Sequence, residues 1–368
     1  MQQDLVSRML DLAVAIQQIP APTFEESERA QTLFKRFLAE ELLDVEIDEH
    51  GNVFGRYPGR GQASPLVVSA HLDTVFASGT RLTLERKDER ICGPGIGDNS
   101  TGVAGLFGLL WSLKSNRLHL PGDLWLVANV GEEGLGNLCG MQAVVDRFAD
   151  QPAAYVVLEG LALGQIYHRA LSSERYRITV HANGGHSWVD YGKPSAIHEL
   201  ARLLNALLEI PLPNHPRTTL NAGVIQGGTS INTIAAEANL ELDLRSESLP
   251  ALHELVTQVE QVCQDFRHKG VKINVDLIGR RPGGELDAHH PLVELAQACL
   301  QSQGIHPHLN IGSTDANIPL SRSLPAVCIG LTTGGGAHTL DEYINTAPTV
   351  KGLAQVVALV EGIYTLPD

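Results

Sequence analysis

Histidine and acidic side chains recur along this 368-residue chain, either directly after short apolar runs or inside glycine-rich loops. The residues in question are His71, Asp73, Asp98, Glu132, Glu133, Glu159 and His338. They supply imidazole nitrogens and carboxylate oxygens, which are the ligands that zinc takes where thiolates are absent. A single His-x-Asp or Glu-Glu motif arises by chance and usually lies in a solvated turn. Several such motifs in one chain predict a metal site.

The same residues are sufficient for two metal ions that share one carboxylate. Two dications held a few ångströms apart need a bridging carboxylate because their charges repel. We assign His71, Asp98 and Glu159 to one ion. We assign Asp98, Glu133 and His338 to the other, so that Asp98 is the bridge. A pair of metals activates a water molecule and polarises a carbonyl group.

Two further residues complete the predicted chemistry. Asp73 lies two residues from His71 and can accept the hydrogen of its second ring nitrogen, which fixes the tautomer. Glu132 is adjacent to the ligand Glu133 and is expected to take the proton of the attacking water and pass it to the leaving nitrogen. The predicted reaction is therefore hydrolysis of a peptide-type amide bond.

These side chains need a sheet whose strands end at one edge, because sites in open α/β sheets form outside the carboxyl ends of the strands. Buried strands are expected at 65–70, 123–130, 153–160 and 325–331. A hairpin is expected within 45–57, with its turn at Gly51-Asn52. Helices are expected at 5–19, 24–43, 138–148, 291–302 and 350–364, and another begins near Ser100 or Thr101. Alternating strands and helices predict an α/β sheet with helices on both faces.

The pattern changes near Leu171, where strands begin to alternate polar and apolar residues. Four such strands, at 175–182, 218–225, 238–246 and 271–278, combine with helices at 195–208 and 252–267. We therefore predict a dimetal-binding α/β domain, residues 1–171 plus 283–368, interrupted by an inserted α+β domain, residues 172–282.

Composition disfavours several classes of partner. The formal net charge of −15 disfavours nucleic acid and anionic membrane surfaces, and no apolar run is long enough for a membrane span. The first residues lack an export signal, and the five cysteines form no C-x-x-C pair, so we expect reduced thiols in a cytoplasmic protein. GPGIGDNSTG lacks the ending of a P-loop, but a phosphate- or nucleotide-binding α/β enzyme stays an alternative.

Eight segments, taken together, resemble one known family. They are SAHLDTV, GPGIGDNSTGVAG, GEEGLG, VVLEG, GGHSW, GGTSINTIA, LDLRS and GGGAH, in this order between about residues 65 and 345. They resemble the zinc exopeptidases that include aminoacylase, glutamate carboxypeptidase, succinyl-diaminopimelate desuccinylase and peptidase T. The resemblance implies a zinc-binding α/β domain with an inserted lid domain that also forms a homodimer. It further implies a cis peptide bond after Asp98.

The resemblance adds three residues in the inserted domain. His186 looks like the family's lid histidine, which polarises the scissile carbonyl and often comes from the partner subunit; alternatively it is a turn histidine beside glycines. Asn232 and Arg245 match residues that hold polar or carboxylate groups of the substrate. For Arg245, a salt bridge at the end of a strand is the alternative.

The implied cofactor is two Zn²⁺ ions per subunit, with Co²⁺ or Mn²⁺ as substitutes. The substrate is expected to be a small peptide or an N-acyl amino acid. GGTSINTIAAEANLELDLRS is most similar to the peptidase T branch, but Glu159 stands where aminopeptidases of the family tend to have Asp. A carboxypeptidase or an N-acyl-amino-acid deacylase therefore stays open, and a metal-binding protein without turnover is a remote alternative.

Overall fold

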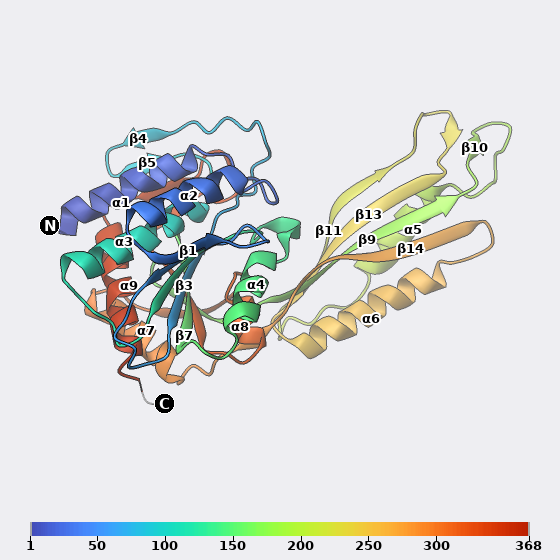
Figure 1. Ribbon diagram of the computed structural model, residues 1–368. Coiled ribbons are helices and arrows are strands. Elements are labelled where there is room, and N and C mark those ends of the chain that lie inside the picture. Colours follow the sequence, from blue (N-terminus) through green and yellow to red (C-terminus); the bar gives the residue numbers. More distant parts are fainter. Residues whose placement is uncertain (1, 367–368) are drawn as a thin grey trace. The chain divides into compact units, whose positions relative to one another are not determined.

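A computed structural model describes residues 2–366, which belong to two compact units (Figure 1). Unit 2 is Leu171–Gly283, and unit 1 is formed by the chain before and after it. The inserted domain expected from the sequence, 172–282, begins and ends one residue inside unit 2. Each unit has its own cluster of buried apolar side chains.

Unit 1 is built on a mixed sheet in the order β1-β2-β6-β3-β7-β17-β8-β15, with β16 paired to β8. Its strands are β1 (Leu43–Ile47), β2 (Val53–Tyr57), β3 (Leu66–His71), β6 (Leu124–Asn129), β7 (Ala154–Glu159), β8 (Gln165–Ala170), β15 (Gly284–Glu285), β16 (His308–Gly312) and β17 (Ala326–Gly330). The four central strands β6, β3, β7 and β17 are parallel, whereas β1, β2 and β15 pair antiparallel. The α/β fold class expected from the sequence is confirmed.

Helices cover this sheet and explain why its central strands are apolar along their length. They are α1 (Gln2–Gln17), α2 (Ser27–Ala39), α3 (Gly102–Ser115), α4 (Cys139–Phe148), α7 (Pro291–Ser302), α8 (Asn317–Ser321) and α9 (Thr349–Ile363). Helix α3 contacts β3 and β7, and α1 and α9 pack against α3. Residues 102–113 of α3 are all buried, as expected for a helix that is apolar on every side.

Helix α3 starts where the sequence predicted, next to Thr101. Thr101 is at the N-cap position, but its hydroxyl donates to the carbonyl oxygen of Ile96 and does not cap the helix. Ile96–Thr101 form an irregular turn ahead of α3, in which Asp98 and Asn99 depart from helical backbone angles, and the Thr101 hydroxyl is used within this turn. This turn contains Asp98.

A small second sheet in unit 1 has the order β18-β19-β5-β4. Its strands are β4 (Glu85–Lys87), β5 (Arg90–Cys92), β18 (Gly334–Gly335) and β19 (Tyr343–Asn345). They are only two or three residues long, too short for a periodic pattern, and the sequence did not predict them. The sheet joins the segment before Asp98 to the segment after His338.

Unit 2 is an antiparallel sheet in the order β11-β13-β9-β14, with two helices packed on it (Figure 1). Its elements are β9 (Ser172–Ala182), α5 (Ala196–Leu208), β11 (Thr218–Gly227), β13 (Glu237–Ser246), α6 (Leu249–Asp265) and β14 (Val271–Arg281). Every second residue of β13 is buried under α5 and α6, which is the alternation read from the sequence. A short pair, β10 (Gly185–His186) and β12 (Thr233–Ile234), extends beyond one end of this sheet.

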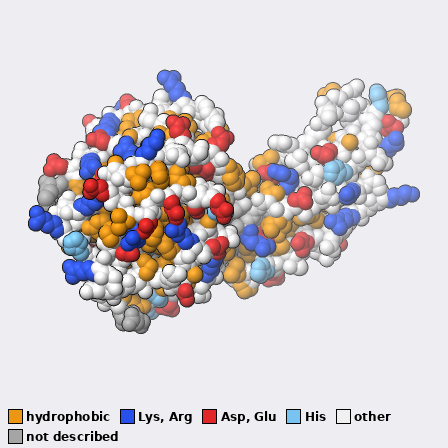
Figure 2. Space-filling view, viewed as in Figure 1, with side chains coloured by type: hydrophobic (Ala, Val, Ile, Leu, Met, Phe, Trp, Pro, Cys, Tyr) orange, Lys and Arg blue, Asp and Glu red, His pale blue; other side chains and the backbone are white. Residues whose placement is uncertain are grey.

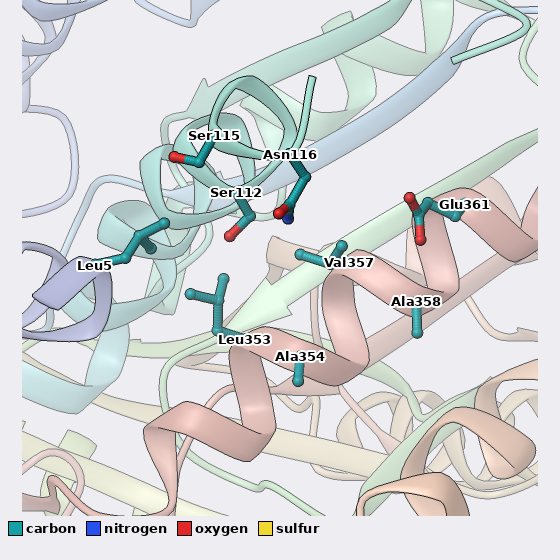
Figure 3. Close-up of a pocket in the computed structure, with 9 residues that line it drawn as sticks. All are labelled: Leu5, Ser112, Ser115, Asn116, Leu353, Ala354, Val357, Ala358 and Glu361. Atoms are coloured by element: carbon teal, nitrogen blue, oxygen red, sulfur yellow. The ribbon is translucent and has the colours of Figure 1, made fainter. Parts of the chain in front are cut away.

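Helices α1, α3 and α9 also border a pocket of about 290 Å³ (Figure 3). Its lining residues are Leu5, Ser112, Ser115, Asn116, Leu353, Ala354, Val357, Ala358 and Glu361. Glu361 is the one ionisable side chain in this lining, so the pocket does not resemble a catalytic site.

Within residues 2–366, no helix combines the length and apolar character needed to cross a bilayer. The cytoplasmic location stays a prediction.

Candidate metal centre

The predicted ligands of unit 1 lie at the carboxyl ends of its parallel strands. His71 is the last residue of β3, and Glu159 is the last residue of β7. Glu132 and Glu133 follow β6, and His338 lies beyond β17, between β18 and β19. Because β6, β3, β7 and β17 are neighbours in the sheet, their ends bring these side chains to one edge.

Asp98 lies between two groups of donor atoms. Its Oδ1 is 3.1 Å from Nε2 of His71, and its Oδ2 is 3.1 Å from Nε2 of His338. Nε2 of His71 is also 3.6 Å from Oε2 of Glu159, and Nε2 of His338 is 3.3 Å from Oε1 of Glu133. Ligand atoms of His71, Asp98 and Glu133 all lie within 4.8 Å of one another. Asp98 thus lies between the two histidines, and each histidine nitrogen has a further carboxylate beside it.

Asp98 is presented by an irregular backbone. The Asp98-Asn99 peptide bond is cis, which confirms the expectation stated above. The buried Asn99 side chain then donates to the carbonyl oxygen of Leu158 and accepts from the N–H of Gly160. Asn99 thereby attaches the Asp98 turn to the end of β7, where Glu159 lies.

Asp73 is fully buried and organises its neighbours. Its Oδ1 accepts the backbone N–H of Glu132, and its Oδ2 accepts the backbone N–H of Glu133 and the hydroxyl of Thr23. Nδ1 of His71 is 3.1 Å from the Asp73 backbone oxygen and 3.4 Å from Oδ1. A proton on Nδ1 leaves Nε2 of His71 available toward Asp98. Asp73 thus orients both a histidine and the Glu132-Glu133 backbone.

The charges at this edge favour cations. Burial acts to lower the pKa of His71, but hydrogen bonds to its carboxylate neighbours raise that pKa well above the ordinary histidine range. A hydrogen bond with Asp98, followed by one with Glu133, raises the pKa of His338 to about 10. Burial raises the pKa of Glu159 to about 7. Crowded carboxylates hold a proton on each histidine here, and the same field favours a divalent cation.

In unit 2, two of the predicted residues lie together. β10 pairs with β12, so that His186 is opposite Thr233, and the N–H of Ser187 donates to the carbonyl oxygen of Asn232. Both His186 and Asn232 are exposed. Nδ1 of His186 accepts the backbone N–H of Trp188 at 3.2 Å. Figure 2 shows hydrophobic side chains and a histidine at the surface of this end of unit 2.

Arg245 lies elsewhere in unit 2. Its Nε donates to Oδ2 of Asp243 at 2.7 Å, and Nε of Arg175 donates to Oδ1 of the same carboxylate. Arg245 therefore makes the salt bridge that was the alternative to substrate binding. Burial, followed by the charges of Arg281 and Arg245, lowers the pKa of Arg175, so these three arginines lie near one another. Glu237, the first residue of β13, lies three residues after Ile234 of β12. Arg245 is eight residues farther along β13, which is roughly 26 Å at the usual strand rise.

The sequence did not indicate several residues that support the centre. Arg29 on α2 is 1% exposed, and its guanidinium donates to the carbonyl oxygens of Ile19 and Leu72. Glu342 is fully buried, and its carboxylate accepts backbone N–H groups of the Asp98 loop. Burial raises the pKa of Glu342 to about 7, although these N–H groups act in the opposite direction. The one sequence signal for Glu342 was that an acidic residue stands four positions after His338.

The same contacts bear on the phosphate-binding alternative. A phosphate cradle needs free backbone N–H groups in its glycine-rich loop. In the GPGIGD segment, the N–H groups of Gly95, Gly97 and Asp98 already donate to Glu342. These donors are therefore not available to a phosphate.

Comparison with known proteins identifies the family of this chain. Residues 67–362 match the model of Peptidase family M20/M25/M40. The chain belongs to this family. As a family member it is a hydrolase of the metallopeptidase class, and the family is metal-dependent.

Similar proteins differ in what they act on. The chain is 29% identical to an acetylornithine deacetylase of Edwardsiella ictaluri, over 90% of this chain and 91% of that protein. A tripeptidase of Staphylococcus aureus has the same fold, with a TM-score of 0.83, 21% identity and coverage of 98% and 99% of the two chains. Aminopeptidase PepT of Bacillus cereus superposes with a TM-score of 0.78, 23% identity and 99% coverage of each chain.

Proposed function

We propose that this protein is a dizinc amidohydrolase that cleaves a small peptide or an N-acyl amino acid bearing a free carboxylate. The observation that carries the proposal is the position of Asp98, with one oxygen 3.1 Å from His71 and the other 3.1 Å from His338. The donor set fits two divalent cations, because each oxygen of Asp98 has a histidine nitrogen and a second carboxylate nearby.

In this proposal His71, Asp98 and Glu159 hold one ion, and Asp98, Glu133 and His338 hold the other. Two bound cations supply a water of lowered pKa and polarise the scissile carbonyl. The chain itself supplies orientation. Asp73 keeps the Nδ1 proton on His71, and its two oxygens hold the backbone on which both glutamates are mounted.

Glu132 is the proposed general base. It is buried and directly precedes the ligand Glu133. Its backbone N–H donates to Asp73, which fixes the backbone position from which its carboxylate extends. A proton acceptor is needed when water attacks the amide carbon, and a proton donor is needed when the C–N bond breaks. A single carboxylate serves both steps: it takes the proton from water and delivers it to the leaving nitrogen.

The inserted unit is proposed to bind the substrate and the oxyanion. Because Nδ1 of His186 accepts a backbone N–H, the neutral ring carries its proton on Nε2 and can donate it to a developing oxyanion. Asn232 is proposed to bind a polar group beside it. Arg175 and Arg245 share Asp243, and the charge of Arg281 also acts on Arg175; this excess of positive charge favours a substrate carboxylate.

The spacing within unit 2 supports a homodimer. His186 and Arg245 lie near opposite ends of the sheet, separated by roughly 26 Å of strand. A dipeptide or N-acyl amino acid is much shorter, so one copy of unit 2 cannot offer both residues to the same substrate. We propose that the partner subunit supplies His186. Exposed Trp188, Tyr191 and Ile231, of which Tyr191 is 90% exposed, suit this end to a protein contact.

Among substrates, an N-acyl amino acid or a peptide with a free C-terminus is favoured over a tripeptide cleaved from its N-terminus. The sequence supports this choice because Glu159 stands where aminopeptidases of the family tend to have Asp. The structure supports it through the cluster of Arg175, Arg245 and Arg281. The similarity to an acetylornithine deacetylase supports the same choice. An N-acyl-amino-acid deacylase is the second candidate within this class, and a metal-binding protein without turnover is the remote alternative.

The decisive experiment combines metal analysis with a substrate screen. Purified protein loaded with Zn²⁺ is assayed against N-acyl amino acids, dipeptides and tripeptides, and bound zinc is counted by mass spectrometry. Glu132→Gln should retain its zinc and lose about two to four powers of ten in turnover. Glu254→Gln, an exposed position on α6, is the matched control. Hydrolysis that is equally fast in the Glu132 variant, or zinc lost from it, contradicts the role of Glu132.

A further inference from the structure

Glu342 accepts several backbone N–H groups of the loop that carries Asp98. Its Oε2 accepts the N–H of Gly95 at 2.8 Å, and its Oε1 accepts the N–H groups of Gly97 and Asp98 at 2.7 and 2.8 Å. Its carbonyl oxygen accepts the N–H of Gly93 at 2.8 Å. One residue therefore receives four N–H groups of the GPGIGD segment.

Short strands bring Glu342 to this loop. β19 starts directly after Glu342 and pairs antiparallel with β5, with Tyr343 opposite Cys92. β5 ends where the GPGIGD segment begins, so this register sets Glu342 against Gly93 and its successors. β19 also pairs with β18, which leaves His338 in the connection between those strands. The two segments that carry Asp98 and His338 are thus joined at Glu342.

The packing leaves the loop little freedom to move away. Glu342 is fully buried. A Cβ atom added at Gly97 would lie 2.7 Å from Cγ of Leu161 and 3.0 Å from Oε1 of Glu342. Bonds from N–H groups to a buried carboxylate are stronger than neutral ones. The position of the Asp98 backbone therefore depends on both oxygens of Glu342.

We propose that Glu342 is a positioning residue that holds Asp98 between the two metal sites before any cation binds. This inference rests on the proposed function, because it assigns Asp98 the bridging role. Glu342 lies on the loop side of Asp98 and bonds the backbone N–H, whereas the Asp98 side chain faces His71 and His338. It acts on the metals only through Asp98.

Replacing Glu342 by Gln tests this arrangement because glutamine has the same shape but one acceptor oxygen. If that oxygen faces Gly97 and Asp98, the NH₂ group faces the N–H of Gly95, which is a donor against a donor. With the opposite orientation, two N–H groups lose their acceptor. The loop then loses its fixed position in either case.

The experiment is a calorimetric titration of Zn²⁺ into the metal-free full-length protein, repeated with Co²⁺ while its visible spectrum is recorded. Glu342→Gln should bind zinc roughly 10–100-fold more weakly than wild type, the usual effect of losing a residue that orients a ligand. Its cobalt spectrum should change as well. Asp341→Asn, an exposed neighbour with the same acid-to-amide change, is the control and should bind like wild type. Melting of the metal-free proteins separates this effect from unfolding.

The outcomes distinguish the two proposals. If wild type binds no zinc, the proposed function fails and this inference fails with it. If wild type binds zinc and Glu342→Gln binds with the same affinity and spectrum, only the positioning role is overturned. Should the variant not fold, hydrogen exchange in metal-free wild type replaces it. Slow exchange of the Gly95, Gly97 and Asp98 amides supports the role, and unprotected exchange overturns it.

Discussion

Arg29 offers a direct test of how the centre is supported from outside. Its guanidinium donates to the Ile19 carbonyl oxygen at 2.6 and 3.2 Å and to the Leu72 carbonyl oxygen at 2.6 Å. Leu72 lies between His71 and Asp73, so this bond fixes the backbone that presents both. Burial lowers the pKa of Arg29 to about 10, which leaves it charged at neutral pH.

Arg29→Lys keeps the charge but supplies one compact donor in place of a planar fork. A lysine ammonium can reach one of the two carbonyl groups, and the other is left buried without its donor. An unsatisfied buried acceptor costs about 1–3 kcal/mol, so we expect the unfolding free energy of unit 1 to fall by that amount. The change is large compared with a typical surface substitution.

Urea unfolding of the metal-free protein, followed by tryptophan fluorescence, measures this loss. Trp111 and Trp125 lie in unit 1, whereas Trp188 of unit 2 is 86% exposed and should change little on unfolding. Arg36→Lys, an exposed position on the same helix, is the control and should change stability by less than about 0.5 kcal/mol. If Arg29→Lys is equally mild, the buried guanidinium does not hold this backbone.

Three further predictions concern cations, protons and the inserted unit. Chelation should lower the melting temperature in calorimetry, because Asp98, Glu133 and Glu159 then repel one another; an unchanged curve argues against a metal centre. Burial raises the pKa of Glu26 above 4.5, so its contribution to stability is complete below that value and is lost as the pH rises. Glu26→Gln should therefore gain stability relative to wild type between about pH 5 and about pH 8, and urea unfolding at both pH values measures this. His186→Ala should lower turnover without loss of zinc, and mixing it with an inactive Glu132→Gln protein should restore activity only if His186 comes from the partner.

Much of the fold could be read from local patterns. Central strands such as β3 are apolar throughout because helices cover the sheet, and β13 alternates because helices cover it on one side. Strands of two or three residues, such as β18 and β19, carry no periodic pattern and could not be predicted. The start of α3 near Thr101 was predicted correctly, but the sequence could not show that the Thr101 hydroxyl bonds Ile96 in the turn before the helix.

For the candidate site, the sequence alone determined the ligand types, their order and their place after apolar runs. It did not determine which oxygen of Asp98 faces which histidine, since that depends on the spatial order β6-β3-β7-β17, which differs from the chain order. It also did not reveal Arg29 or Glu342. Both bond backbone groups of residues distant in the sequence, and such long-range contacts cannot be predicted from the residues next to Arg29 or Glu342 in the chain. Only the tertiary structure brings the donors and acceptors within hydrogen-bond distance.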